Sequence, residues 1–247
     1  RTDTADLRWR VALLTGGRVK IGYQAGLKLL RAGASLIVTT RFPRDSAARY
    51  AAEPDFENWG DRLEVFGLDL RHTPSVEAFC TQLLATRPRL DFIINNACQT
   101  VRRPPAFYAH MMEGETAALQ TMPAELRKLL GNYEGLRSAD LLPGADATAL
   151  QAGRIEIAGA AGLTRAAELS QVPLLADELL GQAHLFPEGR LDQDLQQVDL
   201  RGRNSWRLLM HEVPSVELLE TQLVNAIAPF IINARLKPLL LRTPDGS

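Results

Sequence analysis

Through its first hundred residues the chain alternates short, continuous apolar runs with segments whose apolar positions recur at helical spacing. Residues 11–14 (VALL) form such a run, which is typical of a strand buried on both faces of a parallel sheet. Residues 21–32 repeat their apolar side chains at helical intervals and meet Gly33, which suits a left-handed helix end. The first unit is therefore predicted to be a strand, a glycine turn and a helix.

The same alternation continues to residue 98. It predicts further strands over residues 35–40, 63–68 and 90–94, with helices between them at residues 45–52 and 75–86. Thr73-Pro74 is predicted to open the last of these helices, with threonine as the N-cap and proline at the first helical position. Because strands separated by helices require right-handed crossovers, we predict an α/β fold with a Rossmann-type, doubly wound parallel sheet. Ligands bind to such sheets at the carboxyl ends of the strands.

A different pattern occupies residues 99–214. Amphipathic fragments at residues 124–130, 164–169 and 174–180 predict mostly helix, and turns are predicted at Pro104-Pro105, Pro143-Gly144 and residues 187–189. A long helix with a kink at Pro229 is predicted for residues 216–240. The chain is thus divided into βαβ units at 1–98, a mainly helical insertion at 99–214 and a core helix at 215–247. The insertion either caps the substrate side of the sheet or forms a partner surface, or it has no direct role in the chemistry.

Composition excludes some classes of partner. The 28 basic and 29 acidic residues give a net charge of -1, which provides no basic face for nucleic acid or anionic lipid. The apolar runs are far shorter than the roughly 20 residues of a membrane span, and the N-terminus is polar rather than signal-like. We expect a cytoplasmic protein with neither nucleic-acid nor membrane partners. The 2 cysteines and 4 histidines have no ligand spacing, so we expect reduced thiols and no metal.

The candidate chemistry lies at the predicted strand ends. Gly16, Gly17 and Gly22 follow the first strand and allow the backbone to approach a pyrophosphate, whose charge would sit on the free amides at the helix start. A glycine turn alone is a weak signal, since any tight connection between strand and helix can use one. The third strand, however, ends at Gly67-Leu68-Asp69-Leu70, and the fourth ends at Asn95-Asn96-Ala97-Cys98.

Together these segments resemble the short-chain dehydrogenase/reductase family. Residues 15–22 (TGGRVKIG) resemble its TGxxxGxG fingerprint, residues 95–98 resemble its NNAG motif, and Asp69 resembles the third-strand aspartate that contacts adenine. The resemblance implies a dinucleotide site formed by Thr15, Gly16, Gly17, Arg18, Lys20, Ile21, Gly22, Asp69, Leu70, Asn95, Asn96 and Ala97.

Two positions depart from the family pattern. Lys20 stands where the middle glycine usually lies, and it either contacts phosphate, as in members that resemble pteridine reductases, or is a solvated lysine. Cys98 replaces the last glycine of NNAG and is interpreted as a minor core substitution.

The end of the second strand bears on cofactor choice. It reads Thr39-Thr40-Arg41, without the acid that NAD-preferring enzymes of this fold place there, and an arginine accommodates a 2′-phosphate. Arg41, helped by Arg18 and Arg44, therefore predicts NADP(H) in preference to NAD(H). The alternative is that Arg41 is a surface charge.

The long helix carries the candidate catalytic residue. Asn225, in LVNAIAPF, matches the family asparagine that helps to hold a water for proton relay, whereas the alternative is a capping or packing role. The resemblance implies a serine and a YxxxK motif further on, with the tyrosine as general acid/base. No tyrosine of this sequence precedes a lysine by four, and Tyr133 is rejected because Arg137 stands at the lysine position and stays protonated.

Both chain ends suggest a piece of a longer protein. The sequence begins with Arg1 and closes with a loop-like TPDGS, so we expect the sheet to be incomplete at the C-terminus. The segment with the catalytic serine, tyrosine and lysine is then either removed, disordered or carried elsewhere. Without the next family helix, the helix at residues 216–240 would expose apolar surface and one sheet edge would be open, which favours either association, for example into a homo-oligomer, or instability.

Two functions remain open at this point. In the first, the parent protein is an NADP(H)-dependent oxidoreductase that acts on a carbonyl or alcohol, and this chain is its cofactor-binding portion, inactive alone. Asn225 favours it. In the second, the chain is a non-catalytic nucleotide-binding or assembly protein on a degenerate scaffold of the same family. The missing YxxxK motif and the long insertion favour it.

Overall fold

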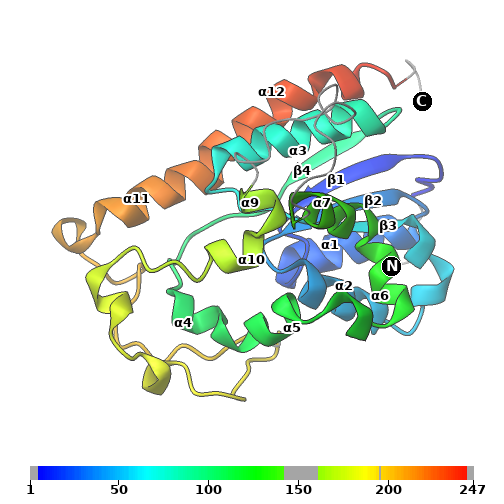
Figure 1. Ribbon diagram of the computed structural model, residues 1–247. Coiled ribbons are helices and arrows are strands. Elements are labelled where there is room, and N and C mark those ends of the chain that lie inside the picture. The colour runs from blue at the N-terminus through cyan, green and yellow to red at the C-terminus, as the bar shows by residue number, and fades with distance from the viewer. Residues whose placement is uncertain (1–4, 142–160, 195, 244–247) are drawn as a thin grey trace.

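The computed structural model describes residues 5–141, 161–194 and 196–243, and a parallel sheet of four strands lies at its centre (Figure 1). The strands are β1 (Val11–Thr15), β2 (Ser35–Thr40), β3 (Leu63–Gly67) and β4 (Phe92–Asn95). They lie in the order β3-β2-β1-β4, and each neighbouring pair is parallel. The predicted strands and the Rossmann-like fold are therefore confirmed. The strand order reverses between β1 and β4, which is where doubly wound sheets bind ligands.

Helices cover both faces of the sheet (Figure 1). One face carries α1 (Lys20–Arg31) and α2 (Pro43–Ala51), and the other carries α3 (Thr73–Thr86) and the C-terminal helix. The C-terminal helix consists of α11 (Ser215–Gln222), a π-helical turn (Leu223–Ile227) and α12 (Ala228–Leu240). Its α12 part lies along α3, with the following side chains buried at helical spacing: Ala228, Ile232, Leu236 and Leu239.

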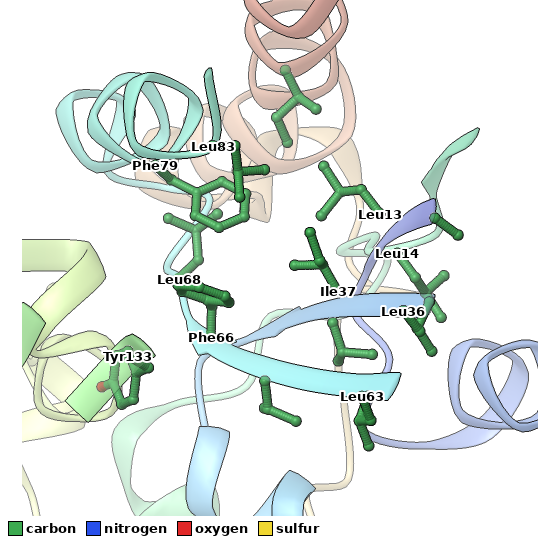
Figure 2. Packing of buried hydrophobic residues seen from close by; sticks show 14 of the residues in the cluster. Leu13, Leu14, Leu36, Ile37, Leu63, Phe66, Leu68, Phe79, Leu83 and Tyr133 are labelled. Carbon is green, nitrogen blue, oxygen red and sulfur yellow. The ribbon is translucent and has the colours of Figure 1, made fainter. Parts of the chain in front are cut away.

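The main core lies between the sheet and these helices. Figure 2 shows Phe66 of β3 facing Phe79 of α3, and their ring centroids are 5.5 Å apart in an edge-to-face arrangement. Tyr133, from the insertion, joins the same core beside β3 and is 1% exposed. Its ring is so close to Gly67 that a Cβ at that glycine would lie 2.5 Å from it. The insertion is thus packed into the Rossmann core.

The described part of the insertion changes character along its length. Its helices are α4 (Pro105–Tyr108), α5 (Met112–Thr116), α6 (Ala124–Leu129), α7 (Gly131–Leu141), α9 (Ala161–Thr164) and α10 (Ala166–Leu169). After Leu169 the described residues form only short 3₁₀ turns and irregular segments, so the prediction of mostly helix is wrong there. The helix predicted at residues 174–180 is one 3₁₀ turn, Ala176–Leu179.

The turns and helix ends that were predicted from proline and glycine are found at some positions and not at others. Gly33 (φ +102°) and Gly189 (φ +74°) are left-handed, as the predicted helix end and turn require. Pro104-Pro105 begins α4 instead of marking a turn, because proline suits the first helical position. Pro143-Gly144 lies outside the described residues.

The start of α3 lies one residue earlier than predicted. His72 is the N-cap, and Thr73 is already helical. The ring of His72 shares a hydrogen bond with the Ser75 hydroxyl, with Nδ1 and Oγ 2.6 Å apart. This contact joins two side chains, and no side chain caps the backbone amides at the start of α3.

The C-terminal helix has a property that the short apolar runs did not predict. Ser215–Leu240 is a continuous helix of 26 residues that contains an 18-residue window with a mean hydropathy of 1.3, which by length and composition alone is sufficient to cross a membrane. In this structure its apolar stripe packs on α3, and Glu220 is buried in ion pairs. Pro229 follows the π-helical turn: it has no amide hydrogen to donate to the carbonyl of Asn225, and the wider turn accommodates this loss.

Candidate functional site

The turn between β1 and α1 is packed too closely for side chains at two of its glycines. Gly16 has a φ of +69°, and a Cβ there would lie 2.8 Å from the Cα of Ala97. A Cβ at Gly22 would lie 2.2 Å from the carbonyl oxygen of Gly16 and 2.4 Å from Nδ2 of Asn96. Both contacts are shorter than van der Waals distance, so the shape of the turn requires glycine at these positions.

The segment after β4 holds this turn in place. Asn96 donates hydrogen bonds from Nδ2 to the carbonyl oxygens of Thr15 (3.2 Å) and Gly16 (3.1 Å). The amide of Ala97 donates to Oγ1 of Thr15 at 3.1 Å. Asn95 instead donates to Oδ1 of Asn233 on α12, at 3.0 Å. Thr15, Asn95 and Asn96 therefore join the glycine turn, the end of β4 and the long helix.

The start of α1 is open to an anion. No side chain caps it, its first turn contains no acid, and among the residues described the amides of Lys20, Ile21 and Gly22 have no hydrogen-bond acceptor. Free amides at the positive end of a helix attract negative charge. Lys20 has a φ of +54°, and its Nζ lies 3.7 Å from Oδ2 of Asp194 in the insertion.

A cavity of about 370 Å³ extends over the strand ends beside this turn. The predicted site residues that line it are Gly16, Arg18, Lys20, Ile21, Gly22, Arg41, Asp69, Leu70, Asn96 and Ala97. The predicted residues that do not line it are Thr15, Gly17, Asn95 and Asn225. The structure thus gathers the ends of β1, β2, β3 and β4 around one space that lies within the usual size range of ligand pockets.

Arg41 differs from the other cations that line the cavity. Within the described parts of the chain it forms no ion pair, although its charge acts on Asp69, and Nη2 donates a hydrogen bond to Oη of Tyr108 at 2.7 Å. Each of the others is paired with an acid: Arg18 with Asp45 at 2.7 Å, Lys20 with Asp194 at 3.7 Å, Arg71 with Asp69 at 2.7 Å and Glu220 at 2.8 Å, and Arg103 with Asp199. The positive charge of Arg41 is therefore the one that no ion pair offsets.

Arg44 was predicted to help Arg41 at the cofactor site, but it lies away from the cavity. Its side chain is buried against the insertion, where Nε pairs with Oε1 of Glu134 at 2.9 Å, and it does not line the cavity. Arg18 does line the cavity, but Asp45 offsets its charge. The sequence around Arg44 does not indicate that it pairs with Glu134, and the sequence around Arg18 does not indicate that it pairs with Asp45.

A buried ionic cluster adjoins the cavity. Glu220 on α11, 4% exposed, accepts from Arg71 at 2.8 Å and from Nε of Arg102 at 2.8 Å. Arg102 also pairs with Glu178 of the insertion. Burial alone would raise the pKa of Asp69, but the hydrogen bonds and charge of Arg71 outweigh it and hold that pKa below its usual value. We call Asp69, Arg71, Arg102, Glu178 and Glu220 the ionic cluster.

Sequence reasoning missed Arg71, Arg102 and Glu220. One signal for Glu220 was present: it lies eight residues before Ala228, on the apolar stripe that continues through Ile232. An acid on the buried stripe of a helix requires a cationic partner.

Cys98 does not belong to the core, so its interpretation as a core substitution is wrong. Its side chain is exposed and lines the cavity. The buried cysteine is Cys80, and burial raises the pKa of its thiol to about 12. The cavity is therefore open at the position where the family has glycine.

Asn225 lies in the π-helical turn and contacts the segment after β4. Its Oδ1 accepts a hydrogen bond from the amide of Gln99 at 2.7 Å, and its Nδ2 donates to the carbonyl of Gln99 at 3.0 Å. Gln99 lines the cavity, as does Val224, the neighbour of Asn225. Asn225 thus does not line the cavity itself but fixes the main chain of Gln99, which does.

The parallel sheet, its flanking helices and the glycine turn at the strand ends define a Rossmann-like fold. Residues 10–120, slightly less than half of the chain, match the family model described as short chain dehydrogenase. This segment is therefore similar to the short-chain dehydrogenase/reductase family.

Curated relatives match the same part of the chain. Dehydrogenase/reductase SDR family member 13 of Bos taurus is 36% identical over 104 residues, which cover 40% of this chain and 27% of the relative. Retinol dehydrogenase 14 of Homo sapiens is 34% identical over 108 residues, which cover 38% of this chain and 32% of the relative. The chain thus matches only about a quarter to a third of the length of these relatives. Among solved structures, a short chain dehydrogenase from Shigella flexneri aligns with 98% of this chain and 55% of its own, at 15% identity and a TM-score of 0.49.

Proposed function

We propose that the chain binds NADP(H) across the carboxyl ends of β1 to β4. In this proposal it is the cofactor-binding portion of an oxidoreductase that transfers hydride between NADP(H) and a carbonyl or alcohol. The similarity of residues 10–120 to short-chain dehydrogenases supports an oxidoreductase of small molecules. The observation that carries the choice of NADP(H) is the guanidinium of Arg41, which lines the cavity without an acidic partner in the described chain.

The residues of the cavity fit the parts of a dinucleotide. The amides of Lys20, Ile21 and Gly22 are free to receive the pyrophosphate, and the absence of a Cβ at Gly16 and Gly22 leaves the turn compact. The ammonium of Lys20 is about half exposed at 3.7 Å from Asp194, so it is free to turn toward a phosphate at little cost. NADP(H) would supply the hydride at its nicotinamide ring.

The 2′-phosphate is the part that would distinguish the two cofactors. A guanidinium binds phosphate oxygens through paired, charge-assisted hydrogen bonds, which are stronger than bonds between neutral groups. Such bonds contribute about 1.5–3 kcal/mol, which corresponds to about 10- to 100-fold in affinity. NADH has a hydroxyl at that place, and an arginine gains little from it.

In the same proposal Asn225 serves the reaction of the whole protein. Its two hydrogen bonds to the main chain of Gln99 use one hydrogen of Nδ2 and one lone pair of Oδ1. These bonds support a role in which Asn225 fixes the segment after β4. The second hydrogen and the second lone pair of this exposed side chain are available to hold a water for proton relay.

Titration of the protein with NADPH and with NADH, followed by calorimetry, tests the proposal. We expect tighter binding of NADPH, and we expect Arg41→Ala to remove most of the difference while changing NADH affinity little. Arg203→Ala is the matched control, because it removes an exposed arginine that pairs with Glu212 and does not line the cavity. If neither cofactor binds, the nucleotide-binding proposal fails; if Arg41→Ala leaves the affinity ratio unchanged, the assignment of NADP(H) fails.

A second candidate function is a nucleotide-binding or assembly protein without catalysis. The observation that favours it is that no tyrosine in these 247 residues precedes a lysine by four. Oxidation of NADPH by the whole natural protein, measured with a panel of aldehydes and ketones, separates the two. Turnover supports the oxidoreductase, whereas tight NADPH binding without turnover supports the second candidate.

A further inference from the structure

Tyr108 brings the insertion into contact with the residue that would select the cofactor. Its Oη accepts a hydrogen bond from Nη2 of Arg41 at 2.7 Å, and the guanidinium carbon lies 4.6 Å from the centre of its ring. Both side chains line the cavity. Arg41 directly follows β2, whereas Tyr108 is the last residue of α4 in the insertion, so 67 positions of sequence separate them.

Tyr108 itself is held firmly. It is 8% exposed and belongs to a small aromatic cluster that is separate from the main core. Its ring centroid lies 5.0 Å from that of Phe42 and 4.9 Å from that of Phe107, and Phe107 in turn packs on Phe186 at 5.8 Å. We call these four residues the aromatic cluster. Tyr108 therefore has one position in which to receive Arg41.

We propose that Tyr108 is a positioning residue that holds the guanidinium of Arg41 in the cavity for the 2′-phosphate of an adenine dinucleotide, so that the insertion takes part in cofactor selection. This inference rests on the proposed function of the cavity. A guanidinium has five N–H donors, and among the described residues Tyr108 Oη is its only acceptor. Most of its donors therefore remain available to phosphate oxygens.

The advantage of this contact is preorganisation. A long arginine side chain on a surface loses rotamer freedom when it binds a ligand, and that loss lowers affinity. Stacking on an aromatic ring and one hydrogen bond restrict the guanidinium before the ligand arrives. The effect acts only on ligands that use Arg41, so Tyr108 should influence NADPH and not NADH.

A double-mutant cycle tests the inference. The variants are Tyr108→Phe, Arg41→Ala and the combination, each titrated with NADPH, NADH and the fragments 2′,5′-ADP and 5′-AMP. Tyr108→Phe keeps the ring in the aromatic cluster and removes only Oη. We expect it to weaken NADPH and 2′,5′-ADP by about 3- to 10-fold, the effect of one hydrogen bond. NADH and 5′-AMP should bind as before, and in the Arg41→Ala background Tyr108→Phe should have no further effect.

The outcomes separate this inference from the proposed function. If Arg41→Ala lowers NADPH affinity but Tyr108→Phe does not, the role of Tyr108 is wrong and the NADP(H) site stands. If neither change affects the ratio of NADPH to NADH affinity, the NADP(H) site itself is wrong. Equal losses for NADPH and NADH in Tyr108→Phe would show a structural role and would also overturn the inference. Phe107→Tyr, which alters the aromatic cluster without touching Arg41, controls for general disturbance of the insertion.

Discussion

Asn225 and Gln99, which are 126 positions apart, exchange two hydrogen bonds: the side chain of one accepts from the amide and donates to the carbonyl of the other. The pair joins the π-helical turn of the long helix to the segment that leaves β4. Only an amide side chain both accepts and donates in this way. Replacing the side-chain amide of Asn225 by a carboxylate or a methyl group should therefore lower the free energy of unfolding.

We expect Asn225→Asp to destabilise the protein more than Asn225→Ala. The carboxylate keeps the bond from the Gln99 amide but faces the Gln99 carbonyl without a hydrogen to donate. Alanine should cost about 1 kcal/mol, since the site is partly open to water, and aspartate should cost about 1–2 kcal/mol. Urea unfolding measures both changes. Gln222→Ala, an exposed position one turn earlier, should change the free energy of unfolding by less than about 0.5 kcal/mol.

Two glycine-to-alanine changes in helices should have opposite effects. At Gly22 of α1 a Cβ would meet the carbonyl oxygen of Gly16 at 2.2 Å, so Gly22→Ala must displace the turn. We expect a loss of about 2–4 kcal/mol in unfolding free energy and a loss of nucleotide binding. Gly135 of α7 has open space around its Cβ position, and Gly135→Ala should stabilise by about 0.5–1 kcal/mol. Chemical denaturation of both variants checks the contrast, and similar effects at the two sites would contradict it.

Glu115 should make the stability of the protein depend on pH. Its carboxylate accepts hydrogen bonds from the amides of Arg44 (3.2 Å) and Asp45 (2.9 Å) at the start of α2, yet burial raises its pKa from 4.5 to about 7. The folded protein therefore holds this proton more tightly than the unfolded chain does. The stabilisation is complete below pH 4.5 and is lost as the pH rises through about 7.

The corresponding variant is Glu115→Gln, which keeps one acceptor and cannot ionise. Relative to the original protein it should gain about 3 kcal/mol of unfolding free energy between pH 4.5 and pH 7. Urea unfolding at several pH values measures the difference. Glu113→Gln, on the same helix but exposed, should leave the pH dependence unchanged; a parallel shift of the two variants would refute the assignment to Glu115.

Glu220 should be far more costly to replace than its neighbour on the same helix. Removal of its carboxylate takes away the anion that Arg71 and Arg102 share, although Arg71 keeps Asp69 and Arg102 keeps Glu178. We expect Glu220→Ala to cost about 1.5–3 kcal/mol, the contribution of a hydrogen bond to a charged group. Glu217→Ala, one turn earlier and outside the ionic cluster, should cost less than about 0.5 kcal/mol. Thermal unfolding compares them, and comparable melting temperatures would show that the ionic cluster contributes little.

The sheet and the glycine turn were predictable because their signals are local. An apolar, β-branched run such as residues 35–40 predicts a buried strand regardless of the sequence that follows. Gly16 and Gly22 likewise predict the turn without information from distant residues. Parallel strands then place their carboxyl ends together, which is why most predicted site residues line one cavity.

What could not be predicted depends on partners far away in sequence. Nothing near Arg44 indicates that it turns to Glu134, and nothing near Arg41 indicates Tyr108. The same holds for Arg71 and Glu220, 149 positions apart. Charged side chains at a strand end have several directions available, and partners on the insertion and on the long helix determine which one each side chain takes.

The ionic cluster constrains which substitutions the sequence can accept during evolution. Arg71 follows β3, Arg102 follows β4, Glu178 lies in the insertion and Glu220 lies on the long helix, so one buried set of charges draws on four separate stretches of the gene. Substitution of Arg71 leaves Asp69 without its arginine, and substitution of Arg102 does the same to Glu178, whereas matched replacement of the set by apolar residues leaves no charge unpaired. The insertion supplies both Arg102 and Glu178, so a copy of the fold that loses residues 99–214 keeps only the Asp69–Arg71–Glu220 part of the ionic cluster.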